Sequence, residues 1–156
     1  MRISTKIDYA LRAMAELASA AGAEPVKAEY IATKQRIPLK FLLGILSELR
    51  RDHLVRSHRG PDGGYVLGRA GRDITLADVM RALEGPLADV HDDSLRELSY
   101  PDPAASLTEV WKAVRSSLRS VLETTTVADL ASGRLPRRVQ TLAAAYDDAQ
   151  QTRAGR

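Results

Sequence analysis

Apolar side chains recur at helical spacing along most of this chain, and the pattern is clearest between residues 28 and 67. A short segment with Ile31 and Ala32 on its inward side is followed by a break at residues 35–38. In the next segment leucines recur at steps of three and four, at Leu39, Leu42, Leu43, Leu46 and Leu49. This spacing predicts a helix with one apolar stripe. The helix can begin at Pro38, because the missing N–H of proline has no partner at that position.

Two β-prone runs close this stretch, at residues 54–57 and 65–67. They are separated by a strong turn signal, Arg59-Gly60-Pro61-Asp62-Gly63-Gly64. Helix, turn, helix and hairpin in this order are typical of a winged helix-turn-helix, whose second helix enters the major groove of DNA. A structural helical hairpin with a surface β-loop fits the same pattern. The sequence thus predicts a mainly α fold with a small β-hairpin, and DNA binding is the preferred of the two interpretations.

Further helices are predicted on both sides of this stretch. Before it, one helix spans residues 4–21, ended by Gly22, and a short one spans residues 27–34. After the hairpin, helices begin near residues 75, 106 and 126, and a final one within residues 136–156 is expected to be mobile past residue 147. Capping boxes, in which side chains at a helix start and three residues later satisfy free N–H groups, are predicted at Thr5–Asp8, Thr75–Asp78 and Ser106–Glu109. Thr126–Asp129 opens the last short helix, and the predicted helix ends after the hairpin are Gly85-Pro86 and Gly133.

The helix that begins at residue 106 carries an apolar seam with the 4, 3, 4, 3 spacing of a coiled coil. Its members are Leu107, Trp111, Val114, Leu118 and Val121, and Val110 widens the stripe. Two heptads are too few for an isolated coiled coil but are enough for a dimer seam that a folded domain supports. Packing within the same chain is the alternative. We therefore expect a winged helix-turn-helix domain in residues 1–85, and a dimerisation helix followed by a short helix in residues 106–133. Residues 134–156 are expected to form a tail that is helical and then disordered.

The net charge of +3 is unevenly distributed along the chain. Residues 1–72 contain 13 Lys and Arg against 7 Asp and Glu, a net charge of +6, whereas residues 73–105 contain 2 against 8, a net charge of −6. A basic face suits a polyanionic partner, although an ordinary solvated surface can vary as much. The residues expected to contact DNA are Lys34, Pro38, Leu39, Lys40, Phe41, Arg50, Arg51, Arg59 and Gly60. Residues 86–105 are expected to form a long acidic loop of the kind that often has a function.

Composition and motifs exclude several classes of function. The chain has no cysteine, which excludes disulfides, thiol catalysis and thiolate-held metal sites. No apolar run approaches a membrane span and no signal peptide is apparent, so a cytoplasmic protein is expected. No phosphate-binding loop, nucleophile elbow or metalloprotease motif is present, and the three histidines share no ligand spacing. An enzyme is therefore not expected.

Several of these segments together resemble the Rrf2 family of bacterial transcriptional regulators. The match runs from residue 1 to about residue 133, and its most specific parts are the wing and the segment that follows it. The segments that carry the resemblance are Met1–Lys6, Tyr9–Met14, Tyr30–Ala32, Ile37–Leu42, Leu54–Leu67, Ile74–Thr75, Asp78–Val79, Leu83–Pro86 and Thr124–Leu130. The resemblance implies a homodimer that binds a palindromic operator in double-stranded DNA and acts as a repressor, with the long helix crossing its dimer mate.

Two departures from the family pattern change what the resemblance implies. Many members sense iron–sulfur status through three cysteines in the loop before the long helix, and here that loop has none, so no cofactor is expected. A signal would then be a small molecule or a partner protein, bound through His91, Asp92, Asp93, Arg96 and Tyr100. A plain solvated linker without a bound ligand fits this loop equally well. A metal held by the oxygen and nitrogen ligands His91, Asp92 and Asp93 is a weaker alternative.

The second departure lies in the second helix of the helix-turn-helix, where Leu43-Gly44 replaces the Glu-Gln of many relatives. Glutamate and glutamine can hydrogen-bond to base edges, whereas leucine and glycine cannot. The DNA sequence recognised is therefore expected to differ from that of those relatives. A protein-interaction module on the same fold, with weak DNA binding, is the alternative function.

Overall fold

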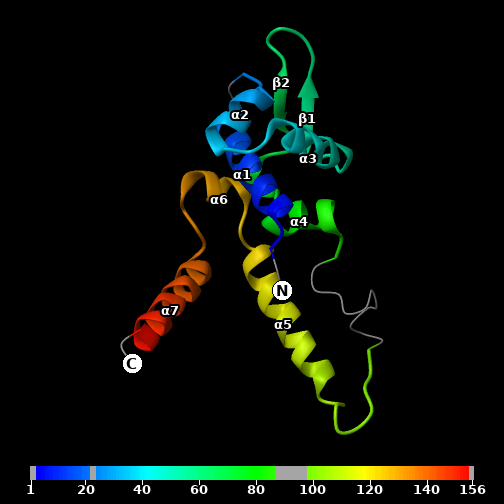
Figure 1. Ribbon diagram of the computed structural model, residues 1–156, viewed down its shortest axis with the longest axis vertical. Helices are drawn as coiled ribbons and strands as arrows, with labels where there is room; N and C mark the ends of the chain where they lie inside the picture. The colour runs from blue at the N-terminus through cyan, green and yellow to red at the C-terminus, as the bar shows by residue number, and fades with distance from the viewer. Residues whose placement is uncertain (1–2, 22–23, 87–97, 155–156) are drawn as a thin grey trace.

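The computed structural model describes residues 3–21, 24–86 and 98–154. In chain order the elements are α1 (Thr5–Ser19), α2 (Ala28–Gln35), α3 (Leu39–Arg51), β1 (Val55–His58), β2 (Gly64–Leu67), η1 (Gly71–Asp73), α4 (Leu76–Glu84), α5 (Leu107–Leu122), α6 (Val127–Ser132) and α7 (Arg137–Ala154). Helices α1–α4 and α6 form one body with the β1–β2 hairpin at one end, and α5 and α7 project from the other end (Figure 1). This confirms the predicted mainly α fold with a small β-hairpin. Within the described ranges, no helix is both long and apolar enough to cross a membrane.

Helix α1 lies at the centre of the core. Its inward face contributes fully buried apolar side chains, and it packs against α2, α3, α4 and α6. The predicted capping box at Thr5–Asp8 is wrong. Ser4 precedes the helix in an extended conformation and its side chain accepts from the backbone N–H of Ile7. Asp8 therefore lies one residue too late to complete a capping box and instead pairs with Arg12 at 2.8 Å. The helix ends at Ser19, and Gly22 lies outside the described residues.

Helices α2 and α3 form the predicted helix-turn-helix. Arg36 ends α2 in a left-handed conformation, with φ 53° and ψ 48°, and Ile37 fills the turn from inside. Pro38 is the residue before α3 rather than its first helical residue. The buried stripe of α3 consists of Leu42, Ile45, Leu46 and Leu49.

The predicted stripe of α3 is wrong at two positions, Leu39 and Leu43, which are 37% and 42% exposed. At 100° per residue, both lie on the edge of the stripe that the other leucines define, on the side away from α1. Ile45 lies on the opposite edge of that stripe, on the side of α1, and is 2% exposed. Two large apolar side chains of α3 are thereby left at the surface.

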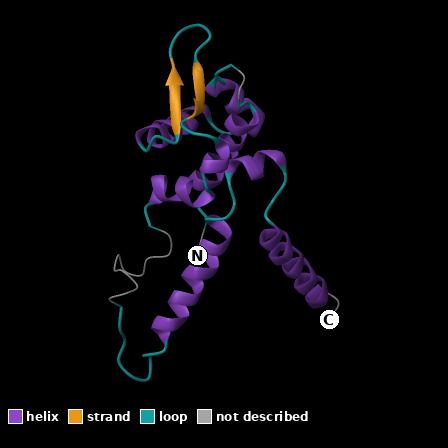
Figure 2. Ribbon diagram, turned by 180° about the vertical axis from the view of Figure 1, so that it is seen from behind, coloured by secondary structure: helices purple, strands orange, loops and turns teal. Residues whose placement is uncertain are grey.

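The wing is an antiparallel pair in which Val55 faces Leu67 and His58 faces Gly64. Strand β2 is joined to Val26, two residues before α2. The N–H of Val26 donates to the carbonyl of Tyr65 at 2.9 Å, and the carbonyl of Val26 accepts from the N–H of Tyr65 at 2.8 Å. Gly63 is required in the turn, because a Cβ there would lie 2.3 Å from the carbonyl oxygen of His58. The wing is therefore held against the helix-turn-helix by backbone hydrogen bonds (Figure 2).

Helices α4 and α6 begin as the sequence predicts. A full capping box is formed by Thr75 with Asp78 and another by Thr126 with Asp129. The two starts are joined, since the N–H of Leu76 donates to the carbonyl of Thr125 at 2.9 Å. Gly133 ends α6 in the left-handed conformation, also as predicted.

The predicted capping box at Ser106–Glu109 is not formed. Ser106 already has helical backbone angles and its side chain makes no capping bond, whereas a capping residue needs an extended conformation. Thr108 donates instead to the carbonyl of Leu98 at 3.3 Å, and Glu109 pairs with Lys112 at 2.7 Å. The chain therefore enters α5 through a turn that is already helical.

Helices α5 and α7 diverge from the body with little mutual packing (Figure 1). No residue of α5 is buried, and Arg138 at the start of α7 donates to the hydroxyl of Ser120 at 3.1 Å. The tail contains a helix as predicted, and α7 continues to Ala154. The mobility expected past residue 147 stays a prediction.

Candidate nucleic-acid interface

The surface of α3 that points away from the core carries one cation near each end of the helix. Helical geometry places Lys40, Gly44, Ser47 and Arg51 opposite the buried stripe, and all four are exposed. Within the described part of the chain, Lys40 and Arg51 make no ion pair or hydrogen bond through their side chains. Their charges are therefore available to a phosphate or a base edge.

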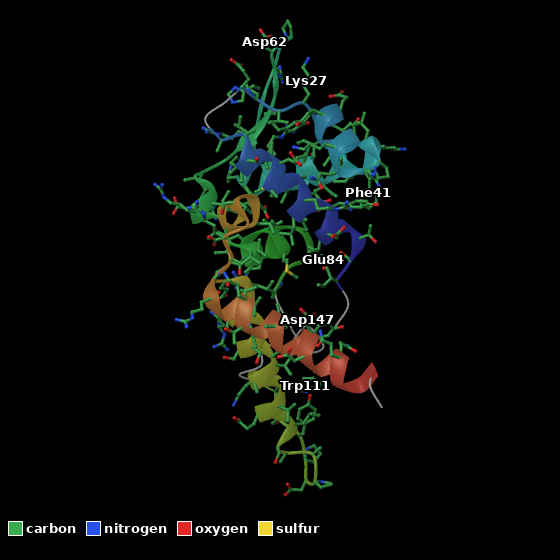
Figure 3. The ribbon with its side chains drawn as sticks, turned by 90° about the vertical axis from the view of Figure 1, so that its left-hand side faces the viewer. Lys27, Phe41, Asp62, Glu84, Trp111 and Asp147 are labelled. Atoms are coloured by element: carbon green, nitrogen blue, oxygen red, sulfur yellow. The ribbon has the colours of Figure 1, made fainter. Side chains whose placement is uncertain are left out.

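The two sides of α3 are tied to different parts of the fold. On the side of the wing, Arg50 donates to the hydroxyl of Ser57 in β1 at 3.2 Å. On the side of α1, Glu48 pairs with Lys6 at 2.7 Å, and the ring of Phe41 meets that of Tyr9 edge-on at 5.7 Å (Figure 3). Of the residues predicted to contact DNA, Arg50 and Phe41 are thus partly committed to contacts within the chain.

A buried carboxylate on α1 organises the end of α2, and the sequence analysis did not identify it. Glu16 is 8% exposed and accepts from the Lys34 ammonium at 2.9 Å and from the side-chain amide of Gln35. Arg12 donates to the Gln35 carbonyl at 2.7 Å. The hydrogen bond to Glu16 is the main reason why the pKa of Lys34 is raised. Lys34, a predicted phosphate contact, is therefore held by α1. A glutamate on the apolar face of a helix was the signal that could have indicated this site.

The wing carries the remaining predicted contacts at its tip. Arg59 and Gly60 are exposed in the turn after β1, with Gly60 at φ 104°, and Asp62 lies at the far end of the hairpin (Figure 3). In the part of the structure that is described, the Arg59 guanidinium has no ion pair. An exposed arginine on a projecting hairpin suits a narrow minor groove.

A trough with a volume of about 670 Å³ lies between α3 and the wing. It is lined by Leu43 from α3, by Lys27 and Glu29 at the start of α2, and by wing residues that include Pro61 and Tyr65. The trough is open and lies between the outward face of α3 and the wing. Its two walls are the elements that a winged helix-turn-helix uses for the major groove and the adjacent backbone.

The predicted dimer seam is uncovered in the single chain. Val110 and Val114 are 51% and 41% exposed, and Leu107, Trp111, Leu118 and Val121 are half-buried. The Trp111 indole N–H donates to the hydroxyl of Tyr100 at 3.2 Å, on the flank of α5 (Figure 3). Packing within the chain therefore does not bury the seam.

Most of the predicted effector site lies outside the described residues, namely His91, Asp92, Asp93 and Arg96. Tyr100 lies within the described residues, and its hydroxyl accepts the hydrogen bond from Trp111. Beside the point where this loop leaves α4, a pocket of about 290 Å³ is lined by Arg81, Arg119 and Pro86. Glu123 joins these two arginines, and hydrogen bonds from Arg119 and then Arg81 lower its pKa below the ordinary value.

Comparisons with known proteins agree with this geometry. Residues 3–133 match the model of the Rrf2 family, described as an iron-dependent transcriptional regulator. Over 155 residues, 99% of this chain and 96% of the relative, the chain is 52% identical to Rv1287 of Mycobacterium tuberculosis, provisionally named an HTH-type transcriptional regulator. The solved structure of CymR, the global cysteine regulator of B. subtilis, matches with a TM-score of 0.74 and 39% identity, covering 85% of this chain and 97% of that one. IscR of T. potens matches with a TM-score of 0.70 and 34% identity, covering 85% and 88%.

The iron in the family description can be tested against the ligands that this chain offers. Iron–sulfur clusters are held mainly by cysteine thiolates, and this chain has no cysteine. Among the residues that the structure describes, no group of three His, Asp or Glu side chains could hold a metal ion. The ligand set therefore does not fit a cysteine-held cluster. By its match over residues 3–133 and its likeness to CymR and IscR, the chain belongs to the Rrf2 family of DNA-binding transcriptional regulators, which are not enzymes, and does so without the thiolates of an iron–sulfur site.

Proposed function

We propose that this regulator is a homodimer that binds a palindromic operator in double-stranded DNA and represses transcription from it. The observation that carries the proposal is a pair of uncovered surfaces at opposite ends of one chain. One is the cationic surface of α3 and the wing, and the other is the apolar seam of α5 (Figure 1).

The seam supports the homodimer. An amphipathic helix without any buried residue has not covered its apolar stripe, and large exposed apolar patches mark sites of association. Spacing of the coiled-coil type suits a second copy of the same helix crossing it. The predicted dimer residues Leu107, Val110, Trp111, Val114, Leu118 and Val121 all lie on this stripe.

The symmetry of such a dimer supports a palindromic operator. Each subunit would place α3 in a major groove, with Lys40 and Arg51 facing the DNA, and the wing over the neighbouring minor groove with Arg59 at its tip. Two-fold symmetry of the protein requires two inverted half-sites, about one helical turn of DNA apart or a multiple of it. A dimer bound across a promoter excludes polymerase without any further contact, which supports repression.

Sensing without thiolates supports an effector of another kind. We propose that a small molecule or a partner protein acts through the loop containing His91, Asp92, Asp93, Arg96 and Tyr100. Such a ligand changes DNA affinity only if it binds the DNA-competent and incompetent states differently. The purified protein is therefore expected to be colourless, with equal operator affinity in aerobic and anaerobic preparations. A visible absorption band with bound iron after anaerobic reconstitution would contradict this expectation.

The test combines sedimentation with DNA titration. The expected results are a dimer in solution and sequence-specific binding that weakens steeply with salt, because phosphate contacts release counterions. A dimer that binds no DNA, or binds with no salt dependence, would favour the protein-interaction module. A monomer that binds a single half-site would contradict the homodimer.

A further inference from the structure

Leu43 is an exposed leucine on the helix that would enter the major groove. It is 42% exposed, although the buried stripe of α3 is already complete without it. Its neighbour Gly44 has no side chain, and on the same flank Arg50 is bonded to Ser57. The wing-side flank of α3 therefore offers a base pair an apolar group where an arginine, asparagine or glutamine would offer hydrogen bonds.

The surroundings of Leu43 point to a nucleic-acid partner rather than an apolar one. Leu43 lines the trough between α3 and the wing, together with Lys27 and Pro61. Lys40 and Arg51 lie on the adjoining outward face, and Arg59 lies at the tip of the wing. The trough also contains Glu29, but the exposed charges on the adjoining face of α3 and at the wing tip are cationic. A leucine flanked by these cations is complementary to a polyanion that presents an apolar group at its surface.

The major groove contains one such group. Each thymine presents its 5-methyl there, and apolar side chains contact it. We propose that Leu43 contacts the methyl group of a thymine in each half-site and sets the preference for thymine at that position. The inference rests on the proposed function, since it requires α3 to lie in the major groove. Leu39, one turn earlier on the same flank, extends the apolar surface towards the helix start.

The test removes the methyl group from DNA one thymine at a time. An operator is first selected from a random duplex library with the full-length protein. Each thymine is then replaced by deoxyuridine, which pairs identically but lacks the 5-methyl. At one thymine of each half-site the replacement is expected to weaken binding about fourfold, the loss expected for one buried methyl group. At the other thymines it should change affinity little.

Protein variants assign that loss to Leu43. In Leu43→Ala, thymine and deoxyuridine at the sensitive position should bind with equal affinity. Leu43→Gln keeps a good helix former and should lose the same discrimination, so it covers the case in which the alanine variant folds poorly. Leu142→Ala is the matched control, because Leu142 is an exposed leucine on α7, far from α3, and it should keep the wild-type response.

The outcomes separate the two proposals. If the wild type shows no sequence-specific, salt-sensitive binding, the proposed function fails and this inference fails with it. If the wild type binds its operator but tolerates every deoxyuridine, only the contact with thymine is overturned. The contact is also overturned if Leu43→Ala and Leu43→Gln remain as sensitive as the wild type, because the effect would then arise from DNA shape or another side chain.

Discussion

Replacing Gly44 by alanine should stabilise the protein and weaken its binding to DNA. Gly44 lies in the middle of α3, and a Cβ built on it meets nothing within 4 Å. Glycine inside a helix is about 1 kcal/mol less favourable than alanine. Because no clash offsets this gain, Gly44→Ala should raise the free energy of unfolding by about 1 kcal/mol, which corresponds to a rise of roughly 2–4 °C in Tm for a chain of this size.

The loss of DNA affinity follows from where the added methyl group points. Gly44 is central in the outward face of α3, so its missing side chain allows the helix backbone to approach the base pairs closely. Overfilling a close-packed contact costs about 1–3 kcal/mol, so operator affinity should fall roughly fivefold or more. Stability and DNA affinity would then change in opposite directions for one substitution.

Urea unfolding and a DNA titration measure the two effects separately. The unfolding midpoint should rise with an unchanged m-value. Gly63→Ala is the control of opposite sign, because its Cβ would lie 2.3 Å from the His58 carbonyl oxygen and so should destabilise the wing. If Gly44→Ala were no more stable than the wild type, Gly44 could not lie inside a helix with open space around it. Unchanged operator affinity would refute close approach of this face to DNA.

Three further predictions concern the wing, the seam and an ion-pair cluster. Arg59→Ala should weaken operator binding by about 1–3 kcal/mol, whereas the control Arg134→Ala, beyond α6, should not. Equal operator affinity of Arg59→Ala and the wild type at physiological salt would contradict the role of the wing. Val114→Asp should give monomers or unfolded chains in sedimentation, whereas Ser116→Asp, on the opposite side of α5, should remain dimeric. A dimeric Val114→Asp protein would refute the role of the seam as the dimer interface. Because the pKa of Glu123 is lowered from 4.5 on folding, its ion pairs contribute stability above pH 4.5 that is lost as the pH falls through the lower folded value. Glu123→Gln should therefore be less stable than the wild type at neutral pH, and a difference that does not shrink in acid would contradict the ion pairs.

The sequence by itself determined those features whose causes are local. The capping box at Thr75 and the helix start at Thr126 form as predicted, because in each the groups that cap the helix lie three residues apart. The end of α6 at Gly133 is also a local feature, because it depends on the left-handed backbone conformation of that one residue. The glycine-rich turn determined the wing in the same way. The motifs that indicate the family also lie in short, contiguous segments.

Other features required the tertiary structure. Apolar periodicity placed Leu39 and Leu43 in the stripe of α3, but which edge of a stripe stays exposed depends on what packs against it. Ser106 satisfied the capping pattern, yet the helical turn that precedes it removed the extended geometry. The first outcome was decided by the packing of α3 in the fold, and the second by the conformation of the turn before Ser106.

The residues of the candidate site also fall into those that the sequence indicated and those that only the fold placed. Its cationic residues Lys40, Arg51 and Arg59 could be selected from composition and position, because charged side chains on a short helix-turn-helix remain at its surface. The commitment of Lys34 to Glu16 could not be predicted, since the two residues are 18 positions apart and meet only when α1 packs against α2. The exposure of the α5 seam was likewise decided by the fold, because a helix that projects from the body leaves its apolar stripe for another chain to cover.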